Sequence, residues 1–302
     1  IALKGVKPFE EYLEAKACGI ETKPVVTGAY TLLKSLRFTG TKKIADIRED
    51  VAGAYREILK KFGELGAKWV QFDEPALVLD LTQEEISLLS ELYQAILEEK
   101  GSVKVLVQTY FGDVRDCWDV LAALPVDGLG LDFIEGARSL ELLRGGFPEG
   151  KTLFAGVVNG KNIWKNNYEK TLGLLRKLSV VAKDVAIGTS CSLLHVPYTI
   201  HAETKLSDAY TQYFAFAEEK LGELSELKEI VSAAVPKKAP AYEKNRELFA
   251  KPRDCVNEAV QKKTAAVTER DCTRLPSFEE RANIQKSVLN LPLLPTTTIG
   301  SF

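Results

Sequence analysis

The chain has 302 residues, of which 45% are hydrophobic and 27% are charged, and its formal net charge is -2. This composition is typical of a soluble globular protein that is long enough to bury a large core. The small net charge gives no long-range attraction to nucleic acid or to an anionic membrane, and no apolar run approaches the length of a membrane span. We therefore expect neither nucleic acid nor a membrane as a partner.

The cysteines indicate the compartment. Five are scattered along the chain without a Cys-x-x-Cys pair, at positions 18, 117, 191, 255 and 272. An odd number of widely spaced cysteines does not suggest a disulfide framework, and free thiols persist in a reducing environment. The pattern predicts a cytoplasmic protein.

Short apolar strands alternate with amphipathic helices through most of the chain. The spacing predicts strands at 23–30, 68–72, 103–110, 128–133, 152–158 and 184–190. It predicts helices at 46–65, 84–99, 116–124, 140–143, 168–178 and 208–227. Nearly continuous apolar strands are typical of a parallel sheet that is buried under helices.

Two α/β folds fit this alternation, a closed (β/α)8 TIM-type barrel and an open doubly wound sheet. No Gly-x-Gly-x-x-Gly motif follows a strand, which removes the main support for a dinucleotide-binding sheet. Polar residues follow five of the predicted strands, at 73–74, 108–113, 132–135, 159–162 and 190–195. Barrels place their ligand loops at this edge, so the pattern favours a barrel mouth, although helix caps and turns explain each cluster taken alone.

The segment from about 232 to 286 differs in composition. It is rich in Lys, Arg, Glu and Ala and is interrupted by prolines. Short solvated helices that link two large domains have this composition, and disorder is the competing interpretation. Apolar anchors for the helical interpretation are Leu248, Phe249, Val256 and Phe278.

Adjacent carboxylates, Asp73 and Glu74, end one predicted strand and precede Pro75. On a rigid strand exit they could bind a cation or act in acid–base catalysis. The competing interpretation is that one of them caps a helix and that the other is solvated.

Cys191 and His195 follow the last predicted strand with a spacing of four residues. Zinc needs three or four ligands, and the nearby His201 and Glu203 are not demanded by any spacing. A nucleophilic Cys–His pair is a second possibility. The favoured interpretation is structural, with a packed cysteine and a histidine bonded to the backbone. The polar loops 159–164 and 110–113 likewise fit either ligand contact or plain turn chemistry.

The end of the chain combines a β-branched run at 296–299 with Gly300 and Ser301. The run predicts a strand, and the small residues after it let a ligand approach the backbone closely. A strand that ends a chain predicts that a further domain of the parent protein follows it.

Together these segments resemble the cobalamin-independent methionine synthases. The matching stretches are 70–77, 108–113, 153–164, 189–195 and, most specifically, 291–302. The resemblance covers essentially the whole chain and is weakest between 232 and 286.

The resemblance implies two (β/α)8 barrels in tandem. Residues 1–230 would form the N-terminal barrel without its first strands, 231–290 a helical inter-domain linker, and 291–302 the first strand of the C-terminal catalytic barrel. The implied reaction moves a methyl group from 5-methyltetrahydropteroyltri-L-glutamate to L-homocysteine and forms methionine. It would use zinc and no cobalamin.

The family places its zinc ligands and catalytic histidine in the C-terminal barrel, so the resemblance implies that this chain alone is inactive. Ile299, Gly300 and Ser301 match the segment that contacts homocysteine or methionine, and Cys191 and His195 do not match the zinc motif. A non-catalytic scaffold that supports a partner barrel and holds the folate tail is the alternative function. An unrelated barrel enzyme that uses Asp73 and Glu74 is a third possibility.

Overall fold

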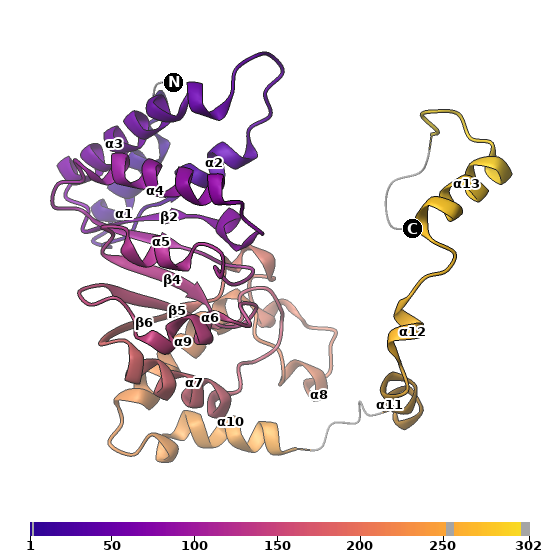
Figure 1. Ribbon diagram of the computed structural model, residues 1–302. Coiled ribbons are helices and arrows are strands. Elements are labelled where there is room, and N and C mark those ends of the chain that lie inside the picture. The colour runs from indigo at the N-terminus through magenta and orange to yellow at the C-terminus, as the bar shows by residue number, and fades with distance from the viewer. Residues whose placement is uncertain (2, 252–256, 297–302) are drawn as a thin grey trace. The chain divides into compact units, whose positions relative to one another are not determined.

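The computed structural model describes residues 1, 3–251 and 257–296. Tertiary contacts divide the chain into two compact units, Ile1–Ala250 and Lys251–Phe302. The first unit contains the sheet and most of the helices, and the described residues of the second form three short helices (Figure 1). None of the helices described is both long and apolar enough to cross a membrane.

Six parallel strands form the sheet of the first unit, in the same order as in the sequence. They are β1 (Val25–Thr27), β2 (Trp69–Asp73), β3 (Lys104–Gln108), β4 (Gly128–Asp132), β5 (Thr152–Val158) and β6 (Asp184–Thr189). This arrangement confirms the predicted α/β fold, because every connection between neighbouring strands is a crossover that contains helix.

Helices follow each strand and pack on the sheet (Figure 1). In the first unit they are α1 (Lys7–Ala17), α2 (Ala29–Ser35), α3 (Arg48–Glu64), α4 (Gln83–Leu97), α5 (Trp118–Ala123), α6 (Ser139–Leu142), α7 (Tyr168–Val181), α8 (Asp208–Thr211), α9 (Ala217–Ser232) and α10 (Pro240–Ala250). The second unit contains α11 (Glu258–Ala265), α12 (Glu269–Cys272) and α13 (Phe278–Leu289).

The predicted helix at 208–227 is wrong, because the structure has two helices there, with α8 ending at Thr211 and α9 beginning at Ala217. Between them, Phe214 forms an antiparallel bridge with Trp164, and the Ala215 N–H donates to the Ile163 carbonyl at 2.7 Å. These tertiary hydrogen bonds compete with helical ones and break the helical pattern.

The predicted first strand, 23–30, is also too long. Its last residues begin α2, with Gly28 as the N-cap.

One face of the sheet packs against the helices and forms the main core. The α3 residues at helical spacing are buried there, including Tyr55 and Phe62. Phe72 of β2 contacts two tyrosines edge-on, Tyr55 with ring centroids 5.4 Å apart and Tyr93 at 6.3 Å. Such pairs add about 0.5–1.5 kcal/mol each beyond the apolar area that they bury.

The opposite face of β2 is half-buried, since Trp69, Gln71 and Asp73 alternate with the buried Val70 and Phe72. The Trp69 ring packs edge-on against Phe154 of β5 at 5.3 Å between centroids. Lys23 Nζ lies 4.6 Å from the Phe154 ring, and burial lowers the pKa of this lysine to about 8. This face therefore carries mixed aromatic, amide and charged groups.

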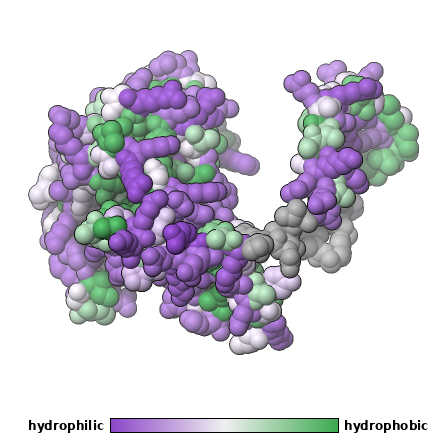
Figure 2. All heavy atoms as spheres, turned by 90° about the horizontal axis from the view of Figure 1, so that it is seen from below, coloured by the Kyte–Doolittle hydropathy of each residue, from purple (hydrophilic) through white to green (hydrophobic). Residues whose placement is uncertain are grey.

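The second unit consists of short, exposed helices over the residues that are described. Asn257 and Ser277 cap the N-termini of α11 and α13 through their side chains. Large apolar side chains such as Leu275 and Phe278 remain exposed. The predicted inter-domain role of 231–290 stays a prediction, and within this range α10 is counted with the first unit. Hydrophilic side chains cover much of the surface in Figure 2, with separate hydrophobic patches between them.

Gly128 tests the packing of the half-buried face. A methyl group there would lie 2.8 Å from Phe154 Cε2 and 3.2 Å from Trp69 Cζ3. We expect Gly128→Ala to displace these rings and to lower the free energy of unfolding by about 1–3 kcal/mol. The control is Gly173→Ala in α7, where no atom lies within 4 Å of the added methyl. It should stabilise by up to about 1 kcal/mol through helix propensity. Urea unfolding followed by circular dichroism measures both, and equal effects would contradict the packing argument.

Candidate functional site

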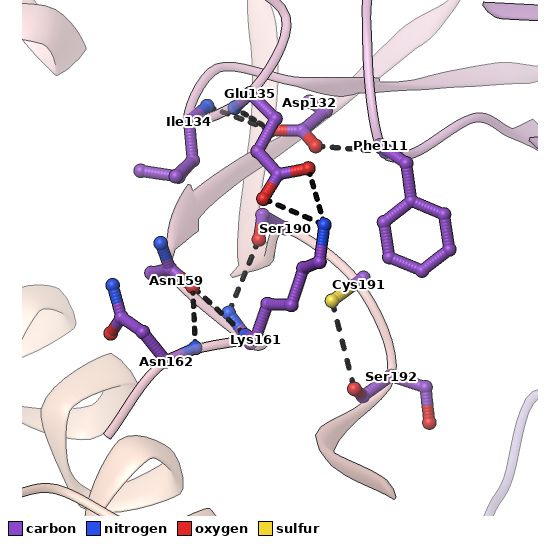
Figure 3. A network of polar contacts seen from close by, with 11 residues as sticks. Phe111, Asp132, Ile134, Glu135, Asn159, Lys161, Asn162, Ser190, Cys191 and Ser192 are labelled. Carbon is purple, nitrogen blue, oxygen red and sulfur yellow. Dashed lines mark hydrogen bonds and ion pairs between the residues drawn. The ribbon is translucent and has the colours of Figure 1, made fainter. Parts of the chain in front are cut away.

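Residues that follow the strands of the sheet gather at its carboxyl edge, as the parallel register requires. Figure 3 shows the part of this edge that is formed by the ends of β3 to β6 and the loops after them. It brings together four of the five polar clusters that the sequence predicts, and the fifth, Asp73 and Glu74, follows β2.

Glu74 is a fully buried anchor and not a free catalytic group. Its Oε1 accepts hydrogen bonds from the Tyr30 N–H at 2.8 Å and the Tyr93 hydroxyl at 2.6 Å. Its Oε2 accepts from the Thr31 N–H at 2.7 Å and the Thr31 hydroxyl at 2.6 Å. Burial raises the pKa of Glu74, while these four donors oppose the shift. The carboxylate thus binds N–H groups in the first turn of α2 that have no partner within the helix, and it links α2 and α4 to the end of β2.

Gly28 makes room for this anchor. A Cβ at this position would lie 2.1 Å from the Glu74 carboxyl carbon. Its N–H donates to the Asp73 carbonyl at 2.7 Å, so the backbone lies directly against β2. Sequence reasoning missed Gly28, because it placed this glycine inside the predicted strand 23–30 and not before a helix.

Asp73 lies on the half-buried face of the sheet. Its Oδ1 accepts from Gln71 Nε2 at 2.7 Å, and its Oδ2 accepts from the Tyr110 hydroxyl at 3.3 Å. Burial raises the pKa of Asp73, and these two hydrogen bonds and Lys23 oppose the rise. The two adjacent carboxylates therefore point to different sides of the sheet and do not act as a pair.

Asp132 at the end of β4 organises the next loop. Its Oδ1 accepts from the N–H groups of Ile134 and Glu135, and its Oδ2 accepts from the Phe111 N–H at 3.0 Å (Figure 3). Burial raises the pKa of Asp132, and these backbone donors oppose the rise. Phe111 has φ of 74°, which is uncommon for a non-glycine residue, and the bond to Asp132 helps to hold it there.

An exposed ion pair lies at the carboxyl edge of the sheet. Lys161 Nζ donates to both carboxylate oxygens of Glu135, at 3.0 and 2.9 Å, and lies 4.9 Å from the Phe111 ring (Figure 3). The pair raises the pKa of Lys161. It is solvent-exposed, so its contribution to stability is small. The lysine charge is nevertheless already matched by a carboxylate.

The loop 159–164 is built by local turn chemistry and by a contact to the residue that follows β6. Asn159 Oδ1 accepts from the N–H groups of Lys161 and Asn162, and the Gly160 N–H donates to Ser190 Oγ at 3.1 Å. A Cβ at Gly160 would lie 2.5 Å from the Cys191 carbonyl oxygen. The turn chemistry of this loop is confirmed, and its predicted contact with a ligand stays a prediction.

Cys191 and His195 are not brought together as a catalytic pair. The Cys191 thiol donates weakly to the Ser192 carbonyl at 3.7 Å, and the exposed His195 ring packs against Phe111 at 5.4 Å. Burial raises the pKa of the Cys191 thiol, which is the wrong direction for a nucleophile. Within 1, 3–251 and 257–296, no group of three or more His, Cys, Asp or Glu residues could hold a metal ion. The buried cysteine agrees with the structural interpretation, whereas the described contact of the His195 ring is with Phe111 and not with the backbone.

The predicted substrate residues Ile299, Gly300 and Ser301 lie outside the described residues. Their role stays a prediction. At the described edge, the carboxylates of Glu74, Asp132 and Glu135 are occupied by donors from the chain itself. The arrangement is suited to holding loops in place, and Asp73 is the half-buried carboxylate that faces away from the core.

Comparison with known proteins places these features in a family. Residues 1–183 match the family model described as the N-terminal domain of the cobalamin-independent synthases. The whole chain is 48% identical to a 5-methyltetrahydropteroyltriglutamate–homocysteine methyltransferase of Campylobacter jejuni, and 49% identical to one of Streptococcus thermophilus. In both cases it spans 40% of the relative's length.

Solved structures show the same fold at lower sequence identity. A B12-independent methionine synthase from Shewanella in complex with selenomethionine aligns with a TM-score of 0.56 at 20% identity. The alignment covers 82% of this chain and 69% of that chain. At this identity the likeness supports the fold.

Glu74→Gln tests the buried anchor. The amide nitrogen replaces an oxygen that accepts two hydrogen bonds, so buried donors lose their partner. We expect the free energy of unfolding to fall by about 1–3 kcal/mol, measured by urea unfolding. The matched control is Glu84→Gln in the exposed first turn of α4, which should stay within about 0.5 kcal/mol of the parent. Two variants of equal stability would refute the anchor.

Thiol labelling tests the structural interpretation of Cys191. We expect iodoacetamide at pH 7.5 to modify Cys191 and Cys117 at least about ten times more slowly than Cys18 and Cys272, because the first two are buried and the last two are exposed. Peptide mass spectrometry over a time course measures the four rates. If Cys191 reacted fastest, an activated nucleophile would replace the structural interpretation.

Proposed function

Since this chain belongs to the cobalamin-independent methionine synthase family, we propose that it is the N-terminal part of a methyltransferase that forms methionine. The parent enzyme would transfer a methyl group from 5-methyltetrahydropteroyltri-L-glutamate to L-homocysteine. The observation that carries this proposal is the 48–49% identity across the whole chain to relatives that are named for this reaction. Because the chain spans 40% of those relatives, the rest of the parent protein is part of the proposal.

The role of this chain within the parent enzyme would be supportive and not catalytic. A general acid or base must reach a proton of the substrate, and the carboxylates of Glu74 and Asp132 are instead bonded to the chain's own donors. Asp73 is less enclosed, but its two oxygens accept from Gln71 and Tyr110. This occupancy favours the supportive role over the unrelated barrel enzyme that would use Asp73 and Glu74.

Zinc is proposed as the metal of the parent enzyme, with its ligands in the C-terminal barrel. The residues described in this chain do not fit a zinc site, because Cys191 and His195 make separate contacts and no cluster of three ligand residues forms among them. No cobalamin is expected, in keeping with the family to which the chain belongs.

The proposed substrate contact in this chain is the segment Ile299, Gly300 and Ser301. Backbone N–H groups and a serine hydroxyl are suitable donors for the carboxylate of homocysteine or methionine, and a glycine allows close approach. The C-terminal barrel would be the partner of the present domain. We place the protein in the cytoplasm, where free thiols such as Cys117 and Cys191 persist.

The second candidate function is a scaffold that holds the folate tail or only supports the partner barrel. The pure scaffold is favoured by the carboxyl edge, whose polar groups bind one another and where the exposed Lys161 is already paired with Glu135. The two candidates differ in ligand binding by the chain itself.

We expect the purified chain to form no methionine from homocysteine and 5-methyltetrahydropteroyltriglutamate with zinc present, because the proposed zinc ligands lie elsewhere. Chromatography of the product over several hours measures this, with a full-length relative as the positive control. Methionine formation by the chain alone would overturn the proposed division of roles.

Calorimetric titration with homocysteine and with the folate triglutamate, each added separately, distinguishes the two candidates. Binding of homocysteine that is lost in Ser301→Ala would support the substrate contact. Binding of the triglutamate alone would support a tail-holding module, and binding of neither would leave the pure scaffold.

A further inference from the structure

Glu223 of α9 is a buried carboxylate with one unmatched oxygen. The residue is 5% exposed, and its Oε1 accepts from the Asn166 N–H at 2.8 Å. Its Oε2 is buried without a hydrogen-bond partner among the residues that are described. A buried carboxylate oxygen without a donor is costly when it is charged.

Other buried polar contacts lie near Glu223. Lys220 of α9 is fully buried and its Nζ donates to the Trp164 carbonyl at 3.1 Å. From α10, Asn245 Nδ2 donates to the Asn166 carbonyl at 2.9 Å, and its Oδ1 accepts from the Tyr168 N–H at 3.0 Å. The segment 164–168 is therefore held by side chains of two helices.

This segment continues directly from the loop 159–164 at the carboxyl edge. The loop 159–164 is fixed near its start by the Gly160 N–H, which donates to Ser190 Oγ. Near its other end, Asn166 Nδ2 donates to the Val157 carbonyl at 3.1 Å. Loosening 164–168 from α9 therefore weakens one support of the edge loop, while the Gly160 contact and the hydrogen bond from Ala215 to Ile163 remain.

The charged and titratable groups that act on Glu223 come from its own helix, from α7 and from the loop before α7. On its own helix these are Lys220 and Glu226, and the loop contributes Lys165. Tyr168 of α7 donates its hydroxyl to Glu226, and α10 contributes the neutral Asn245. Burial raises the pKa of Glu223 to about 7, more than the Asn166 N–H and the two lysines lower it, and Glu226 adds to the rise.

We propose that Glu223 is a proton-dependent latch, whose ionisation loosens the segment 164–168 from α9 and so relaxes the hold on the loop 159–164. The closed arrangement gives no donor to Oε2, and opening lets water solvate the charged carboxylate. The closed state therefore binds the proton more tightly than the open state.

The direction follows from linkage. A raised carboxyl pKa in the closed state means that closure is favoured by protonation and weakens as the pH rises. Below pH 4.5, the ordinary pKa of the carboxyl group, Glu223 is protonated in both the closed and the open state, and the latch is most firmly closed. Above about pH 7 it is ionised in both states, and the opening equilibrium no longer changes with pH. Between these limits the opening equilibrium rises up to about tenfold per pH unit.

Amide hydrogen exchange of the full chain tests this, measured by NMR between pH 5 and 8.5 and corrected for intrinsic exchange. We expect the protection of the Asn166 and Tyr168 amides to fall up to about tenfold per unit to pH 7 and to level off above it. It should be lower than that of Leu92, a buried residue of α4, because the opening is local. Glu223→Gln keeps the acceptor for Asn166 and should remove the pH dependence, while Glu226→Gln should retain it.

Protection that is independent of pH in the parent chain would overturn the latch. So would protection equal to that of Leu92, or a pH dependence that survives Glu223→Gln. If Glu223→Gln does not fold, the carbon-13 shifts of the glutamate carboxyls decide. A carboxyl that titrates near pH 7 together with the falling protection supports the latch, and titration of all glutamates below pH 5.5 refutes it.

Discussion

The parallel ladder from β1 to β6 places the ends of the strands at one edge and determines what each following residue can contact. In register, Thr27 lies beside Asp73, and Asp73 lies beside Gln108. The backbone continues this pairing beyond the strands, since the Glu74 N–H donates to the Gln108 carbonyl and the Thr109 N–H to the Gly130 carbonyl. The polar residues that follow the strands are thus forced into neighbouring positions, and they must satisfy one another or face solvent.

At this edge most of the polar groups satisfy one another. Glu74 takes four donors from α2 and α4, and Asp132 takes three from the loops after β3 and β4. Each such bond contributes on the order of 1 kcal/mol, and an unpaired buried carboxylate would cost more than that. The edge is therefore stabilised in one arrangement, which suits a domain that supports a partner better than one that must exchange protons with a substrate.

The sequence predicts the strands after the first one well, because their apolar runs are local signals. The range 152–158 matches β5, and the polar clusters after the strands do meet at one edge. The partners of Glu74 could not be found in the same way, because Tyr30 and Thr31 lie more than forty residues before it. No local spacing predicts such a contact.

The error at 208–227 has the same origin. The residues between α8 and α9 are compatible with a helix, and the bridge from Phe214 to Trp164 overrides that preference. Sequence periodicity reports which face of an element is apolar, but a single bridge to a distant loop decides where the element ends. The Cys191 motif could be judged only when the contacts of Ser192 and Phe111 were known.

The edge loop and the end of the first unit are joined through α10. This helix ends at Ala250, where the first compact unit ends, and its Asn245 binds both Asn166 and Tyr168. The same two residues connect the loop 159–164 to α7, which begins at Tyr168. Because α10 belongs to this polar cluster, truncating the chain before Pro240 would remove the Asn245 contacts that support the loop, although it would leave every strand intact.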